Sequence, residues 1–201
     1  MKNIITILLL LLSNIGVFGQ LNESVVNSYY DTIVHYTEFS QYRWEKDYYE
    51  ENIKIYVTGD KEDYLMEELN VILDDLNELI YPLTITITDD SLDNNMLLFI
   101  GERKDFRKIC KEVDKIDSKI RGYGITYGGW RNSIMKSKCF VETKGGNQKF
   151  KKHTLREEIT QCLGFPNDTH QYENSIFYQG YSITNEFSEL DKAIIRKHYS
   201  N

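Results

Sequence analysis

The chain has 201 residues and a formal charge of −7, from 24 Lys and Arg against 31 Asp and Glu. This length suits one domain with a hydrophobic core. The acidic balance argues against nucleic-acid binding, which depends on basic patches. It suits a soluble exported protein.

Residues 1–19 have the pattern of a secretory signal peptide. Lys2 precedes an apolar run from Ile4 to Leu12, and small residues place a cleavage site near Gly19–Gln20. The apolar run is too short to span a bilayer, and no later run approaches the roughly 20 residues that a spanning helix needs. We therefore expect a secreted or periplasmic protein with no transmembrane segment.

The three cysteines are Cys110, Cys139 and Cys162. Export permits a disulfide, and Cys110–Cys139 is the pair that we expect, with Cys162 as a small apolar helix residue. The alternative is that all three are buried free thiols. No Cys and His spacing of a zinc finger occurs.

The mature chain divides into an N-terminal segment and one domain. Residues 20–40 are polar and aromatic, which predicts an arm or a short helix, and the domain is expected over residues 41–201. Alternating apolar residues predict a strand at 53–57. An apolar stripe from Leu65 to Leu79 then predicts a helix, which Pro82 ends.

Further strands are expected in the middle of the chain. Apolar residues alternate with Thr over residues 83–87, and residues 96–100 are apolar throughout, as in a central strand. Residues 139–143 are expected to form a further strand. Apolar residues spaced over 106–116 predict a second helix. The order of these elements predicts a single α/β (α+β) domain, with helices packed on a mixed, twisted sheet.

Residues 122–130, with the sequence GYGITYGGW, combine glycine with aromatic residues. One interpretation is a tight hairpin whose aromatic side chains pack on the sheet. The other is the edge of a cleft that binds an extended chain by strand addition. In the second case Tyr123 and Trp130 would contact the partner.

The segment His153–Asp168, HTLREEITQCLGFPND, predicts a helix over residues 154–163. An apolar face would pack on the sheet, and Glu157 and Gln161 lie one turn apart on the opposite face. Gly164 then ends the helix as a C-cap residue does.

This segment resembles the metzincin metalloproteases, whose motif is HExxHxxGxxH, often followed by Asp. The zinc-ligand positions hold Glu157, Gln161 and Asn167 here. Glu158 matches the general-base Glu, and Asp168 matches the Asp that often follows. The resemblance implies a zincin-like fold.

A second segment is similar to the turn and last helix of the matrixins. Ser175 to Phe177 match the Ser-x-Met turn, with Phe177 in the place of Met. A capping pair of Ser188 and Asp191 then begins a helix expected over residues 188–199. The whole pattern also resembles a family of exported bacterial proteins of unknown function, whose helix reads EExxQxLGxxxD.

These replacements remove the chemistry of a zinc protease. Amide oxygens are poor zinc ligands, so we expect neither a metal nor another cofactor. Without a metal to activate water, Glu158 has nothing to deprotonate. The sequence therefore predicts a non-catalytic binding module, a pseudopeptidase, whose partner is a peptide or a cell-envelope protein.

Two other functions stay open. One is a hydrolase that uses Glu158 as general base with an atypical metal site, to which His153 and His170 could contribute with Glu157. The other is a structural subunit without a functional cleft.

Plainer interpretations exist for the same residues. Thr154 and Glu157 have the spacing of a capping box, and Glu158 could pair with Arg156 or Lys152. The amides of Gln161 and Asn167 could hold the Gly164 turn together. The side chains expected to line the cleft are Asp168, Phe177, His153 and His170, with Phe177 as its floor.

Overall fold

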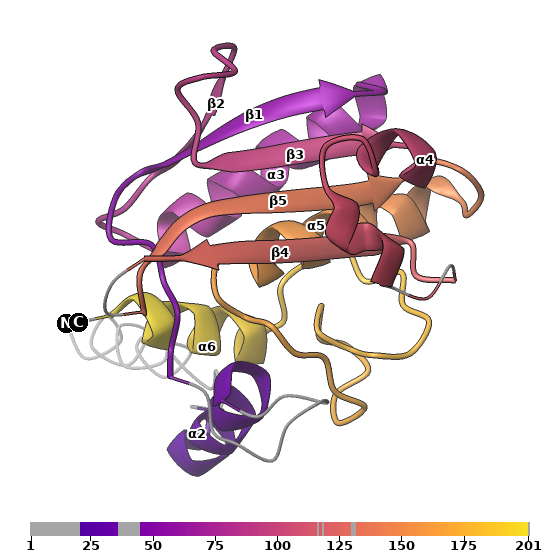
Figure 1. The fold of residues 1–201 in the computed structure, drawn as a ribbon. Helices are drawn as coiled ribbons and strands as arrows, with labels where there is room; N and C mark the ends of the chain where they lie inside the picture. Colours follow the sequence, from indigo (N-terminus) through magenta and orange to yellow (C-terminus); the bar gives the residue numbers. More distant parts are fainter. Residues whose placement is uncertain (1–20, 36–44, 116, 118, 130–131, 201) are drawn as a thin grey trace, which may run out of the picture.

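The computed structural model describes residues 21–35, 45–115, 117, 119–129 and 132–200. Within them, a five-stranded sheet has the strand order β2-β1-β3-β5-β4 (Figure 1). The strands are β1 (Ile53–Gly59), β2 (Ile85–Thr88), β3 (Met96–Gly101), β4 (Gly122–Gly128) and β5 (Ile134–Glu142).

The sheet is mixed, because four of its strands run parallel and β4 runs antiparallel to β5. The prediction of an α/β domain with a mixed sheet is thereby confirmed. β4 forms one edge. The glycine-rich segment is therefore one strand of a β4–β5 hairpin, not a tight hairpin by itself, and Trp130 lies outside the described residues.

Helices α3 (Asp63–Leu79) and α5 (Gln148–Gln161) pack together on one face of the sheet (Figure 1). The predicted stripe of α3 is buried, from Leu65 through Leu76. Leu155 and Ile159 of α5 join the same core. This packing fixes α5 beneath β4 and β5.

The opposite face carries α4 (Arg103–Phe106) and the 3-10 helix η2 (Lys111–Lys115). The predicted continuous helix over 106–116 is therefore wrong. Phe106 and Val113 are buried against Phe140, as predicted for core residues, whereas Ile109 is exposed. Two short turns bury these side chains without a continuous helix.

The N-terminal segment forms α2 (Glu23–Tyr30) and a π-helical turn, η1 (Asp31–His35). α2 packs against α6 (Glu189–Tyr199), whose start at Ser188 has the predicted capping box with Asp191. Residues 1–19 and the boundary expected at 40–41 lie outside the described residues, so both stay predictions.

All three cysteines are free and buried, so the predicted Cys110–Cys139 disulfide is wrong. Cys139 belongs to the main core, whereas Cys110 lies with Phe106 in the small cluster on the other face. The sheet separates the two thiols. The alternative of buried free thiols describes the structure.

No helix in the described part of the chain is both long and apolar enough to cross a membrane.

Candidate functional site

Helix α5 begins earlier than the sequence predicted. The Asn147 side chain caps it by accepting a hydrogen bond from the Phe150 amide at 2.9 Å. Thr154 therefore lies inside the helix, where its hydroxyl donates to the Phe150 carbonyl at 3.0 Å. The predicted capping box of Thr154 and Glu157 is wrong, because the helix start is already satisfied two turns earlier.

The turn after α5 requires glycine at position 164. Gly164 has φ of +106°, and a Cβ there would lie 1.9 Å from the Asp47 carbonyl oxygen. The His198 ring also passes over this turn and donates from Nε2 to that oxygen at 2.9 Å. The predicted role of Gly164 is thus met, with a packing reason that the sequence did not reveal.

His198 joins this turn to the N-terminal helix. Because Nε2 donates, Nδ1 accepts from the Tyr30 hydroxyl at 3.1 Å. Burial lowers the pKa of His198 to about 3, so its ring is neutral. No sequence pattern indicated this role.

Three carboxyl groups gather at the end of α5 and in the loop after it: Glu157, Glu158 and Asp168. Glu158 is 6% exposed and lies under β4. A Cβ on Gly122 would lie 2.2 Å from its Oε1, so glycine makes room for this side chain. Its Oε2 has no hydrogen-bond partner among the described residues.

Burial and the neighbouring Glu157 raise the pKa of Glu158 well above its ordinary value. Burial and Asp168 do the same to the pKa of Glu157. Both effects favour the neutral carboxyl, which cannot accept a proton as a general base must.

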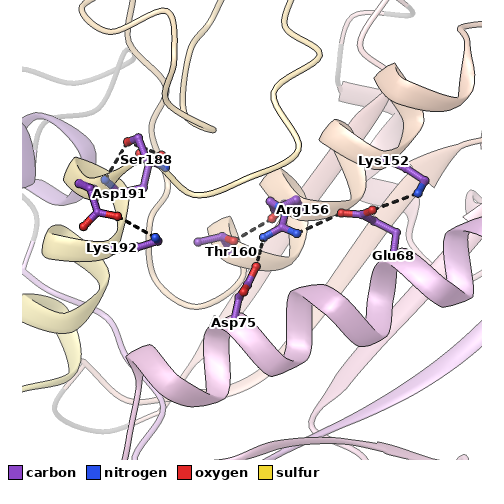
Figure 2. Close-up of polar contacts among 9 residues, drawn as sticks. Glu68, Asp75, Lys152, Arg156, Thr160, Ser188, Asp191 and Lys192 are labelled. Atoms are coloured by element: carbon purple, nitrogen blue, oxygen red, sulfur yellow. Dashed lines mark hydrogen bonds and ion pairs between the residues drawn. The ribbon is translucent and has the colours of Figure 1, made fainter.

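The interpretation that Glu158 pairs with Arg156 or Lys152 is wrong. Arg156 donates to Asp75 at 2.6 Å and to Glu68 at 3.0 Å, and Lys152 lies 3.2 Å from Glu68 (Figure 2). These basic side chains turn toward α3, on the far side of α5 from β4. No cation contacts Glu158 in the part of the chain that the structure describes.

The two amides at the zinc-ligand positions are occupied by hydrogen bonds. Gln161 Nε2 donates to Asp168 Oδ1 at 2.6 Å, and Asn167 Nδ2 donates to the Ile33 carbonyl at 2.9 Å. Asn167 therefore holds η1, and Gln161 holds the loop after α5. The two amide groups thus donate to different partners.

The atypical metal site that His153, His170 and Glu157 could form is not assembled among the described residues. His153 Nδ1 lies 2.7 Å from the Thr184 carbonyl, and Nε2 lies 3.6 Å from Glu157 Oε2. His170 is exposed and contacts the Tyr178 ring edge-on. In the described ranges, no group of three or more His, Cys, Asp or Glu is placed to hold a metal ion.

The second motif segment is joined to the last helix by buried hydrogen bonds. Ser175 Oγ donates to Asp191 Oδ1 at 2.6 Å and accepts from the Tyr29 hydroxyl at 2.6 Å. Phe177 is fully buried against Phe165. It is a core residue and does not line the cavity described next.

A cavity of about 250 Å³ lies between the end of α5, β4 and the N-terminal segments. Its walls are Val34, Glu45, Asp47, Gly124, Thr126, Gln161, Gly164 and Pro166. Of the predicted site residues, only Gln161 is among them; Asp168, His153 and His170 are not. Sequence reasoning missed Glu45 and Asp47, since a polar segment before a strand carries no signal of its place.

The outer edge of β4 borders this cavity. The register and the bond from the Glu142 amide to the Arg121 carbonyl show that Tyr123 pairs with Phe140 through its backbone. The backbone groups of Gly124 and Thr126 consequently point away from β5. An edge with free amides and carbonyls can pair with another chain.

The fold is a single α/β domain in which the antiparallel edge strand β4 borders a cavity at the end of α5. The chain belongs to the family described as "Protein of unknown function (DUF2927)", which matches residues 23–201. No curated protein matches it. The predicted membership of a family of unknown function is confirmed.

A solved structure titled "Structure of Myroilysin" is similar to this chain, with a TM-score of 0.46 and 10% sequence identity. The similarity covers 78% of this chain and 81% of that chain.

Substitution of Glu158 tests its protonation. In Glu158→Gln, stability should match wild type at pH 4 and exceed it at pH 8. The reason is that a carboxyl with a raised folded-state pKa loses stability as pH rises above 4.5, the ordinary value. This gap, the difference in free energy of unfolding between Glu158→Gln and wild type, should widen by at most about 1.4 kcal/mol per pH unit.

Urea unfolding at pH 4, 6 and 8 measures this gap. His198 destabilises the fold as pH falls from 6.5 towards 3, but it does so in both proteins and cancels in the difference. The exposed Glu173→Gln is the matched control, because it removes the same negative charge from a position open to solvent. A constant gap for Glu158→Gln would mean that Glu158 is ionised in the fold.

Proposed function

We propose that this protein is a non-catalytic binding module, which receives an extended segment of a partner peptide on the outer edge of β4. The observation that carries the proposal is the backbone edge at Gly124 and Thr126, which points away from β5, pairs with no other strand among the described residues, and borders the cavity. Strand addition uses such an edge for affinity and adjacent hollows for specificity.

The local sequence suits this role. Gly122 and Gly124 let β4 lie close to α5, since a Cβ on Gly124 would meet Cys162 Sγ at 3.0 Å. On the other face of the strand, Tyr123 and Ile125 pack against the cluster around Phe140. Both faces of β4 are thus held, which keeps its edge rigid and available for pairing.

The chemistry of α5 and of the loop after it supports binding rather than hydrolysis. Glu158 lies under β4 with a raised pKa, and the amides of Gln161 and Asn167 are used in structural hydrogen bonds. A hydrolase would need Glu158 ionised and reachable by water. Export to the cell envelope, and a partner located there, belong to the same proposal.

Capture from a randomised octapeptide library tests this function. Immobilised protein spanning residues 20–201 should retain a subset of extended peptides. Two versions of a retained peptide are then compared, one N-methylated at its odd-numbered amides and the other at its even-numbered amides. One version should lose binding and the other should keep it, because only every second amide faces β4. Equal binding of the two versions would exclude strand addition.

A variant of the protein tests the same edge. Thr126→Pro removes the outward N–H without removing a bond to β5, and it should weaken retained peptides about tenfold, equivalent to about 1.4 kcal/mol. Thr126→Val keeps the N–H and is the matched control. Fluorescence anisotropy measures both, with thermal unfolding as a check of folding. Unchanged affinity of Thr126→Pro would contradict the proposal.

A further inference from the structure

Resting on the proposed function, we infer that the added peptide strand carries a Lys or Arg, whose cationic end enters the cavity between Glu45 and Asp47. The inference goes beyond strand addition, because it names the side chain that the cavity selects.

The charge of the cavity wall is one-sided. Among the described residues that line it, Glu45 and Asp47 are acidic and none is basic. Burial and the proximity of Glu45 raise the pKa of Asp47 above its ordinary value. Both effects destabilise the Asp47 carboxylate, and the attraction of a cation placed beside it would offset them.

Neighbouring groups in the described structure do not supply that cation. Lys46 lies over the Tyr48 ring, 4.9 Å from its centroid, and faces a different hollow that it shares with His198. Glu45 accepts a hydrogen bond from the Asn132 side-chain amide, which is neutral. These contacts orient the acidic segment without neutralising it.

The rest of the cavity suits a long basic side chain. Val34 and Pro166 offer apolar surface to a methylene stem, while Gly124 and Gly164 leave the interior open. The backbone carbonyl of Asp47 is held by His198 at 2.9 Å, so this wall has a fixed position. A Lys or Arg entering beside β4 would pack its stem and pair its charge.

The test uses the randomised octapeptide library with three proteins. The first is wild type, and the second is Glu45→Gln with Asp47→Asn, which keeps size and hydrogen bonding. The third is Glu50→Gln with Glu51→Gln, which removes the same charge from exposed positions outside this cavity. Circular dichroism and thermal unfolding confirm that all three fold.

Wild type and the Glu50/Glu51 variant should enrich Lys or Arg at one position of the retained peptides. The Glu45/Asp47 variant should lose that preference and bind a retained Lys peptide about tenfold more weakly, close to its norleucine analogue. Retention of peptides without any basic preference would overturn this inference and leave strand addition standing. Retention of no peptide would overturn strand addition, and the inference with it.

Discussion

Arg156→Met is expected to destabilise the fold by about 3–5 kcal/mol. Arg156 is 1% exposed and contacts the carboxylates of Glu68 and Asp75 from α3, so it joins the two helices beneath the sheet (Figure 2). Its guanidinium also lies over the Phe187 ring, 4.7 Å from the centroid. Among the described residues, removal of Arg156 leaves the buried Glu68 with Lys152 as its remaining cation.

Urea unfolding at pH 7 measures this loss, and a double-mutant cycle assigns it. Lys152→Met removes the more exposed partner of Glu68 and should cost about 1 kcal/mol or less. Glu68→Leu combined with Arg156→Met should recover much of the stability, because no carboxylate is then left buried beside an apolar residue. A single Arg156→Met variant as stable as wild type would show that the buried pair adds nothing.

Gly164→Ala is expected to cost roughly 2–5 kcal/mol, from a strained left-handed backbone and a steric clash together. The clash is with the Asp47 carbonyl oxygen, which a Cβ would approach to 1.9 Å. Since Asp47 belongs to the cavity wall, the variant should also lose peptide binding. Thermal unfolding and the anisotropy assay measure the two effects.

Gly145→Ala separates the two causes. Gly145 has φ of +81°, but apart from its two chain neighbours no described residue would lie within 4 Å of a Cβ at this position. Its substitution should cost only the backbone strain, about 1 kcal/mol, and leave peptide binding unchanged. If the two variants lost equal stability, the close approach of Asp47 to the turn would be without consequence.

Helices and strands that depend on apolar periodicity or on a capping pair were predicted from the sequence. The apolar stripe of α3, the apolar strand β3 and the capping pair of Ser188 and Asp191 all lie where the sequence indicated. Periodicity failed at 106–116, because Phe106 and Val113 are buried from two separate turns. Asn147, the actual cap of α5, lies well before the helix start expected at residue 154.

The candidate site was less predictable, because tertiary contacts bring it together. Glu157, Gln161 and Asn167 match the zinc-ligand positions of the motif, but no local pattern indicated that Asn167 donates to the Ile33 carbonyl of η1, 134 residues earlier in the chain. Glu45 reaches the cavity through the chain path before β1. The position of Asp47 depends on its packing against Gly164 and His198, which no local sequence pattern indicates.

Amide hydrogen exchange with a retained octapeptide bound tests the central claim most directly. If the peptide adds to β4, the amides of Gly124 and Thr126 should become protected, while Tyr123 and Ile125, already bonded to β5, should change little. This alternation is specific to strand addition at the outer edge. Binding that leaves the exchange of Gly124 and Thr126 unaltered would place the peptide elsewhere and contradict the proposed function.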